Sequence, residues 1–558
     1  MLIRLNSIIR GHSAVSRPVI DLLLAFLRND LVPVIPLRGT VSASGDLMPL
    51  SYIAGALEGN PDILVQTGAS HDYRMISAKE ALRILRIEPI TLGPKEGLGL
   101  INGTAVSSAV ASLVIHETNQ IAVVTQILTA MGVEALLGQE ESFHPFISQA
   151  RPHLGQLEVA ENILRYLQGS RLAKGVHGKK DRSRPGLYQD RYGFRTAPQW
   201  IGPQLEDLLL ANRQILVELN STTDNPLIDV AQGEVYSGGN FQAASITSAM
   251  EKTQGTLQML GRLLYSQSSE IINPSLNNGL PPNLCADEPS LSFTMKGIDV
   301  NMAAYMSELS FLSNRVSSHV LSAEMNNQSV NSLALIAGRT AMQAVELSSL
   351  MSASYLYVLC QALDLRARQF NFFRALQPQV KQIVSETFSS TLSDGDLAVL
   401  QDRMYMHIEE SWLCKSHLDS ENRISKVVET TVQVVTDTLL NSSLRDSPTI
   451  SFLATVSSWK LQAQRTISHV WNEITEEFKQ HQNTAEYLGM GSKMLHRFVR
   501  QDLGVPFHQG LNEHPSANDC AGDTLMGRPK RTIGSWVSII YDSMRSGSLH
   551  DFIMQCQP

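Results

Sequence analysis

The chain has 558 residues, of which 43% are hydrophobic and 18% charged, and its formal net charge is -8. This length can bury a large core, and the acidic balance argues against nucleic acid or an acidic membrane surface as a partner. The five cysteines are scattered and lack CxxC spacing, which predicts neither a disulfide framework nor a zinc site. No secretory signal and no bilayer-spanning stretch is recognisable, so we expect a soluble cytoplasmic protein.

The most distinctive chemistry lies in the segment RGTVSASGDLMPLSYIAGAL, residues 38–57. Its centre, Ala43-Ser44-Gly45, could condense on itself. Attack of the Gly45 nitrogen on the Ala43 carbonyl, with loss of two waters, would give an imidazolone whose exocyclic methylene comes from Ser44. Small residues permit the tight bend that this ring closure needs. A Gly-Ser loop ahead of a capped helix is the plainer interpretation of the same residues.

A helix is expected directly after this tripeptide, over residues 46–57. Asp46 is placed to cap it, and Pro49 is tolerated in a first turn because its missing N–H matters little there. The tripeptide would then lie at the positive end of the helix dipole. Negative charge that arrives on an electrophile is stabilised at such a position.

The rest of the chain is predicted to be mostly α-helical. Residues 329–365 carry apolar side chains on nearly every face and few charges, which is typical of a long helix buried at the centre of a bundle. Strand-like alternation is short and rare. The pattern becomes more charged after about Arg366, which indicates a domain boundary. No solenoid repeat or low-complexity tract is present in the sequence.

The chain resembles the aromatic amino acid ammonia-lyases and aminomutases, in which the tripeptide matures into 4-methylidene-imidazole-5-one. The resemblance rests on blocks that follow the family's order: RGTVSASGDLMPLSYIAGAL, PKEGLGLINGTAV, QDRYGFRTAPQWIGPQ, NSTTDNPLIDV, GGNFQ, NNGLPPNL and AEMNNQSVNSLALI. AEMNNQ and the later VRQDLGVPFHQG are most similar to fungal phenylalanine ammonia-lyases. The resemblance implies a mostly α fold of the fumarase and histidase superfamily. It also implies a homotetramer with shared active sites.

The resemblance further implies a division into domains. Residues 1–102 would be the remaining part of the methylidene-imidazolone domain, 103–367 the central helical core, 368–489 a helical shielding insertion, and 490–558 the return to the core. Family members carry a further N-terminal segment with a loop tyrosine that removes the β-proton. We expect the chain as given to be truncated and to lack this tyrosine, and loss of a general base costs a factor of about 10²–10⁴ in rate.

Elimination of ammonia from an α-amino acid needs a carboxylate clamp, contacts for the amine and a base for the β-proton. The resemblance gives Arg195 the clamp role, since a guanidinium grips a carboxylate with two parallel hydrogen bonds. Asn102 and Tyr192 would hydrogen-bond the imidazolone oxygen or the substrate amine. Glu324 would accept the amine's proton. A structural carboxylate at Glu324 is the alternative.

Further residues complete the expected site by resemblance. Three amides would orient the same groups: Gln189, Asn225 and Gln328. Four apolar residues would line the ring pocket: Phe241, Leu98, Ile101 and Val300. Amides more often act as caps or satisfied core groups, and apolar side chains more often belong to an ordinary core.

We therefore expect a carbon-nitrogen lyase that converts L-phenylalanine into trans-cinnamate and ammonia, without a metal or an external cofactor. Two alternatives stay open. A phenylalanine 2,3-aminomutase uses the same ring but returns ammonia to the β-carbon. A truncated, non-catalytic subunit would assemble with full-length homologues. The sequence leaves the choice between phenylalanine and tyrosine open.

Overall fold

The computed structural model describes residues 1–68, 72–175, 188–441, 449–516, 524–525 and 527–556. The chain forms two compact units. The first comprises residues 1–122, 203–261 and 306–348, and the second comprises 123–202, 262–305 and 349–558. Helices dominate the described part of both units, and the strands there are no longer than four residues. The prediction of a mostly α fold is confirmed.

Several long helices contribute residues to both units. They are α6 (Ala105–Ala135), α10 (Ala197–Leu219), α11 (Ala244–Ile272), α12 (Lys296–Leu312) and α13 (Ala334–Phe388). The predicted long buried helix corresponds to α13, in which every residue from 351 to 369 is buried. It begins later than predicted, because Leu333 has a positive φ of 53° and donates its N–H to Val41 O. It also continues past Arg366 to Phe388 without a break.

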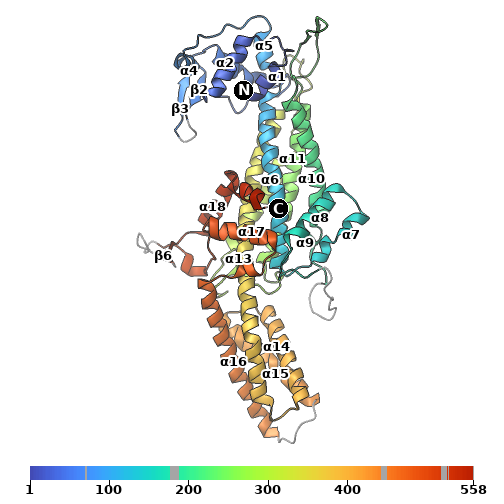
Figure 1. The fold of residues 1–558 in the computed structure, drawn as a ribbon, viewed down its shortest axis with the longest axis vertical. Helices are drawn as coiled ribbons and strands as arrows, with labels where there is room; N and C mark the ends of the chain where they lie inside the picture. Colours follow the sequence, from blue (N-terminus) through green and yellow to red (C-terminus); the bar gives the residue numbers. More distant parts are fainter. Residues whose placement is uncertain (69–71, 176–187, 442–448, 517–523, 526, 557–558) are drawn as a thin grey trace. The chain divides into compact units, whose positions relative to one another are not determined.

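The N-terminal part of the first unit packs short helices around a small antiparallel sheet, drawn in blue in Figure 1. Its elements are α1 (Leu2–Ile8), α2 (Arg17–Arg28), β1 (Val32–Pro33), α3 (Leu47–Leu57), β2 (Leu64–Thr67), β3 (Arg74–Ser77), α4 (Ala78–Leu85) and α5 (Glu96–Ile101). The strand order is β1-β2-β3, with Val65 opposite Ile76. In α2, the buried residues recur at the i, i+3, i+4 and i+7 positions of one helix face: Val19, Leu22, Leu23 and Phe26. The first unit also holds the hairpin of β4 (Leu227–Asp229) and β5 (Glu234–Tyr236) and the turn η3 (Ser317–His319).

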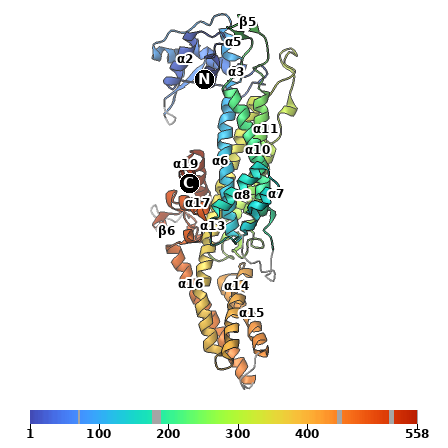
Figure 2. The same ribbon diagram turned by 45° about the vertical axis from the view of Figure 1, so that its right-hand side comes forward.

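The second unit contains a helical bundle, shown in yellow and orange in Figures 1 and 2. The C-terminal part of α13 packs there with α14 (Asp394–Cys414), α15 (Ser420–Asn441) and α16 (Thr449–Gln480). Trp412, Trp459 and Phe372 are fully buried in its core. These helices make up most of the segment 368–489, which was predicted to be a helical insertion.

The remaining elements of the second unit are short. They are η1 (Glu140–Phe143), α7 (Pro145–Ala150), α8 (Leu154–Tyr166), α9 (Tyr192–Arg195), η2 (Pro282–Leu284), η4 (Thr484–Glu486), α17 (Met490–Arg497), the π-turn η5 (Phe498–Asp502), η6 (Gly510–Glu513), β6 (Thr524–Leu525), β7 (Arg528–Pro529), α18 (Ile533–Arg545) and α19 (Ser548–Cys556). Among the described helices, none is both long and apolar enough to cross a membrane.

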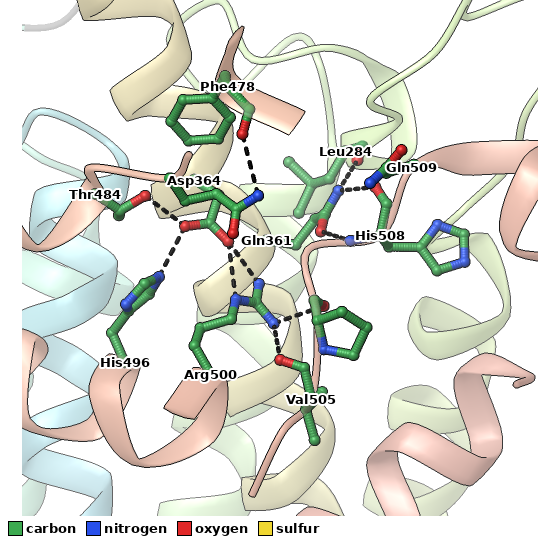
Figure 3. A network of polar contacts seen from close by, with 12 residues as sticks. Leu284, Gln361, Asp364, Phe478, Thr484, His496, Arg500, Val505, His508 and Gln509 are labelled. Carbon is green, nitrogen blue, oxygen red and sulfur yellow. Dashed lines mark hydrogen bonds and ion pairs between the residues drawn. The ribbon is translucent and has the colours of Figure 1, made fainter. Parts of the chain in front are cut away.

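A buried ionic network joins the segment after α16 to α13 (Figure 3). Asp364 on α13 accepts hydrogen bonds from Arg500 Nε at 2.9 Å and Nη2 at 2.7 Å. It also accepts from Thr484 Oγ1 at 2.5 Å and lies 2.7 Å from His496 Nε2. Burial alone would raise the pKa of Asp364, but Arg500 and His496 lower it to about 2. The carboxylate is therefore fully charged within the core.

Glu134, near the end of α6, is a second buried carboxylate, and it forms no ion pair with the described residues. Its Oε1 accepts a hydrogen bond from Gly489 N at 2.6 Å, whereas its Oε2 has no partner among the described residues. Burial raises the pKa of Glu134 from 4.5 to about 7. The folded chain therefore binds this proton more tightly than the unfolded chain does.

We predict that Glu134→Gln removes a pH-dependent loss of stability. Below about pH 4.5, Glu134 is protonated in both states and no penalty exists. As the pH rises to about 7, the folded state must ionise a buried group and loses about 2–3 kcal/mol. The variant should therefore have a larger free energy of unfolding than the parent at pH 8, measured by urea denaturation. This difference should become small near pH 5. Exposed Glu158→Gln is the control, and an equal gap at both pH values would contradict the prediction.

Candidate active site

The tripeptide segment is fixed by a close backbone approach within the first unit. Asp46 N donates to Gly103 O at 2.7 Å, and Gly45 and Gly103 form a parallel bridge. Gly45 has a φ of +67°, and a Cβ there would lie only 2.3 Å from Gly103 O. A residue with a side chain cannot occupy this position without displacing the backbone. The third residue of the tripeptide therefore has to be glycine.

Gly103 is enclosed on its other side as well. A Cβ at Gly103 would lie 2.3 Å from Thr223 O. Buried Arg4 donates from Nη1 to the same Thr223 carbonyl at 3.0 Å, and from Nη2 to Gly99 O. Three chain segments, around Gly45, Gly103 and Thr223, thus pack backbone against backbone.

Asp46 does not play the role that was predicted from the sequence. It is the N-cap residue of α3, but its side chain makes no capping hydrogen bond there. Its carboxylate instead accepts from Ser107 N at 2.7 Å and Ser107 Oγ at 2.6 Å, in the first turn of α6, and from Ser42 Oγ at 3.3 Å. The approach of Gly45 to Gly103 brings the start of α6 to this carboxylate. Asp46 therefore bonds Ser107 instead of capping α3. Burial raises the pKa of Asp46, and the Ser107 hydrogen bonds oppose that rise.

A second segment, residues 328–335, lies against the tripeptide. Gln328 Nε2 donates to Ser44 Oγ at 3.2 Å, and Ser332 Oγ donates to Ser42 O at 2.8 Å. Gln328 is thus brought to the tripeptide, as the resemblance implies. Glu324 lies in the preceding turn, exposed and with a φ of +48°, and its Oε2 accepts from Asn327 Nδ2 at 3.1 Å. In this single chain Glu324 is not a helix residue.

Asn102 and Asn225 also meet in the first unit. Asn102 Nδ2 donates to Asn225 O at 3.0 Å, and Asn225 Oδ1 accepts from Gly238 N at 2.6 Å. Asn102 is buried, and its Oδ1 has no hydrogen-bond partner among the described residues. An unpaired buried acceptor beside Gly103 is unusual for a purely structural amide. Three of the predicted apolar lining residues belong to the same unit and are partly exposed: Leu98, Ile101 and Phe241.

The remaining predicted residues belong to the second unit. Arg195 Nη1 donates to Gln189 Oε1 at 2.7 Å, and its guanidinium carbon lies 4.9 Å from the centre of the Tyr192 ring. Arg195 Nε is buried and has no partner among the described residues. Tyr192 is 71% exposed and Val300 is 63% exposed. The structure thus brings Gln189, Tyr192 and Arg195 together.

Polar contacts that the sequence analysis missed hold this segment in place. Arg191 Nη1 donates to Glu270 Oε1 at 3.0 Å and to Leu276 O at 2.9 Å, and Gln267 Nε2 donates to Gly193 O at 2.8 Å. Asp190 Oδ2 accepts from Gln139 N at 2.7 Å. Asp190 and Arg191 stand inside the QDRYGFRT block, so the motif already contained them. The partners of Arg191 and Asp190, which are Glu270, Leu276 and Gln139, are distant in sequence and carry no local signal.

The predicted prosthetic group can be tested against these residues. Gly45 occupies a space that no side chain could fill, and Gln328 Nε2 donates to Ser44 Oγ. Small residues in a tightly braced loop with polar neighbours are what an imidazolone formed from Ala43, Ser44 and Gly45 needs. The donor set fits the group.

Comparison with known proteins identifies the family to which the chain belongs. The family profile for aromatic amino acid lyases matches residues 1–386. The chain belongs to the aromatic amino acid lyase family. It is 52% identical to a phenylalanine ammonia-lyase of Aspergillus hancockii, over 100% of this chain and 79% of that protein. It is 47% identical to a phenylalanine aminomutase of Talaromyces islandicus, over 99% of this chain and 76% of that protein.

Solved structures of the lyase family have the same fold. The crystal structure of phenylalanine ammonia-lyase from Rhodosporidium toruloides has a TM-score of 0.92 and 39% identity, and covers 100% of this chain and 81% of that one. A histidine ammonia-lyase of Trypanosoma cruzi has a TM-score of 0.58, 25% identity and coverage of 83% and 78%. The predicted histidase-like helical fold is therefore confirmed.

We predict that Asp46→Asn destabilises the aromatic lyase fold by about 1–3 kcal/mol. An amide can accept from only one of the two Ser107 donors at full strength, and it places a new donor among groups that are already donors. Denaturant unfolding compares this variant with Asp62→Asn, in which an exposed carboxylate is changed in the same way. Equal midpoints for the two variants would refute a bracing role for Asp46.

Proposed function

We propose that the chain eliminates ammonia from L-phenylalanine to give trans-cinnamate. The observation that carries this proposal is the braced Ala43-Ser44-Gly45 segment, with Gln328 donating to Ser44 and Gly45 packed on Gly103. The substrate class follows from the relatives at 52% and 43% identity, whose names give phenylalanine ammonia-lyase activity. An imidazolone made from the tripeptide would supply an electrophilic methylene that takes up the amine.

The chain's own residues would bind and orient the substrate around that group. Arg195 would grip the carboxylate: Gln189 holds its Nη1 and Tyr192 supports its planar face, which leaves in-plane N–H groups for two parallel hydrogen bonds. Asn102 would offer its unpaired Oδ1 as an acceptor for an N–H of the substrate amine. Fixed dipoles of this kind lower the barrier because they need no reorganisation during the reaction.

We further propose a homotetramer with active sites shared between subunits. The predicted site residues fall into two sets that belong to different compact units. Large apolar side chains on α10 and α12 are exposed in the single chain, among them Leu216 at 61%, Val217 at 64% and Phe311 at 73%. Exposed apolar surface on long helices is typical of a subunit interface. Glu324 and Tyr192, exposed here, would be covered on assembly. Light scattering on the purified protein measures this directly.

Ser44→Ala is predicted to abolish cinnamate release, with at least a ~10³-fold loss, because alanine has no hydroxyl to eliminate and so cannot form the exocyclic methylene. Intact-mass spectrometry of the parent should show the deficit of two waters that ring formation requires, and the variant should lack it. Ser51→Ala is the matched control, since Ser51 is exposed on α3 and its Oγ donates to Met48 O within the same helix. A parent chain whose intact mass lacked the deficit of two waters would refute the proposal.

Arg195→Lys is predicted to raise the KM for phenylalanine by about 10–100-fold, since an ammonium cannot reproduce the paired hydrogen bonds to a carboxylate. Steady-state kinetics should show a smaller effect on an amide analogue of the substrate, which lacks the carboxylate charge. Arg497→Lys, an exposed position on α17, serves as the control. An unchanged KM would remove Arg195 from the clamp role.

A phenylalanine aminomutase is the second candidate, favoured by the relative from Talaromyces islandicus at 47% identity. Both reactions would use the same residues, and they differ in whether the ammonia returns to the β-carbon. Chiral chromatography of the products from isotopically labelled phenylalanine separates them. Free cinnamate as the main product supports the lyase, and β-phenylalanine as the main product supports the aminomutase.

A further inference from the structure

A small cavity lies inside the second unit, away from every residue of the predicted active site. Its volume is about 30 Å³, which leaves room for roughly two water molecules. The loop 279–289 forms one side, and α13, α14, α15 and α16 supply the rest of the lining. Arg368 and Arg423 both line it, together with Trp412 and Trp471.

The two guanidinium groups lie on aromatic walls. The Arg423 guanidinium carbon is 4.0 Å from the centre of the Trp412 ring, and that of Arg368 is 5.0 Å from the centre of the Trp471 ring. The two indole rings are themselves 4.9 Å apart. Stacking covers the planar faces of a guanidinium, so its N–H donors remain available only in the plane of the group.

Several donors of these residues are left over. Arg423 Nε and Nη2 donate to Trp412 O, at 3.1 and 2.6 Å, and Arg368 Nη1 donates to Ala286 O at 2.8 Å. Arg368 Nε and the Trp412 indole nitrogen are buried and have no hydrogen-bond partner among the described residues. Unpaired buried donors cost free energy, which an acceptor inside the cavity would recover.

Neighbouring Arg366 on α13 is also buried, but its donors are paired. Its Nε and Nη2 donate to Ala135 O, and its Nη1 donates to Gln369 Oε1 at 2.6 Å. Only carbonyl and amide oxygens are needed to satisfy it. Arg368 and Trp412, which carry the unpaired donors, both line the cavity.

The charges around the cavity limit what can occupy it. Asp287 is the one carboxylate in the lining, and its Oδ2 accepts from Leu511 N at 3.0 Å. Glu288 lies nearby, outside the lining, and its Oε2 accepts from Ser420 N at 2.7 Å. Cys285 also lines the cavity, and burial raises the pKa of its thiol to about 12, so it is neutral. Two cations and one anion thus face the space.

We propose that this cavity binds one small monovalent anion, of which chloride is the cellular example, between Arg368, Arg423 and the indole N–H of Trp412. Within the lining itself, two guanidinium groups face one carboxylate. A phosphate or sulfate would be too large for 30 Å³ and would bring a second negative charge close to Asp287. The anion ties the loop 279–289 to the helical bundle.

Bromide tests the site directly because it replaces chloride and scatters anomalously. Crystals of the full chain grown in sodium bromide should show an anomalous peak inside the cavity, within hydrogen-bond distance of Arg368 Nε. The proposal would be overturned if the cavity held water and bromide bound only at surface positions, as an adventitious ion only. Ring formation and lyase activity play no part in this readout, so its failure would leave the proposed function untouched.

Thermal denaturation gives a second test in solution. Replacing gluconate by chloride at constant ionic strength and pH should raise the parent's midpoint by about 2 °C or more. Trp412→Phe keeps a ring but loses the N–H, and should lose most of this rise. Arg423→Lys should lose it as well and replaces Trp412→Phe if that variant does not fold. Arg366→Lys is the matched control: its midpoint falls, but the chloride-dependent rise persists. Equal rises in the parent and the Trp412 or Arg423 variant would refute the site.

Discussion

Backbone packing without side chains is the constraint on which the candidate active site depends. Gly45 lies on Gly103, and Gly103 lies on the carbonyl of Thr223, with no room for a Cβ at either glycine. This stacking fixes the tripeptide against the start of α6 and brings the Asp46 carboxylate to the Ser107 donors. Burial of the Asp46 carboxylate is offset by these hydrogen bonds.

The same packing explains why the polar residues gather as they do. The segment around Thr223 that covers Gly103 also carries Asn225, whose carbonyl holds Asn102. The segment that precedes α13 brings Gln328 to Ser44. Arg195 and Tyr192 are held by an independent set of contacts in the second unit, through Arg191 and Glu270. Each set of residues is therefore held by contacts within its own unit.

The sequence predicted a good deal of this, and its failures have physical reasons. The helical fold and the long buried helix follow from periodicity, which is a local property. The motif residues Gln328 and Ser44, far apart in sequence, lie within hydrogen-bond distance of each other. Asp46 was predicted to cap α3, but its side chain bonds the first turn of α6. Which of these two helix N-termini it bonds depends on the contact of Gly45 with Gly103, which is distant in sequence. Charge after Arg366 did not end α13, since amphipathic packing in the bundle sustains a helix with a polar face.

The ionic network at Asp364 has a consequence for the length of the polypeptide. All three side chains that satisfy this carboxylate, Thr484, His496 and Arg500, come from the stretch that follows α16. A product that stopped short of them, through a premature stop codon or proteolytic nicking, would strand a bare negative charge in the middle of α13. Such a product would be cleared by cellular quality control rather than persist as a partly working enzyme.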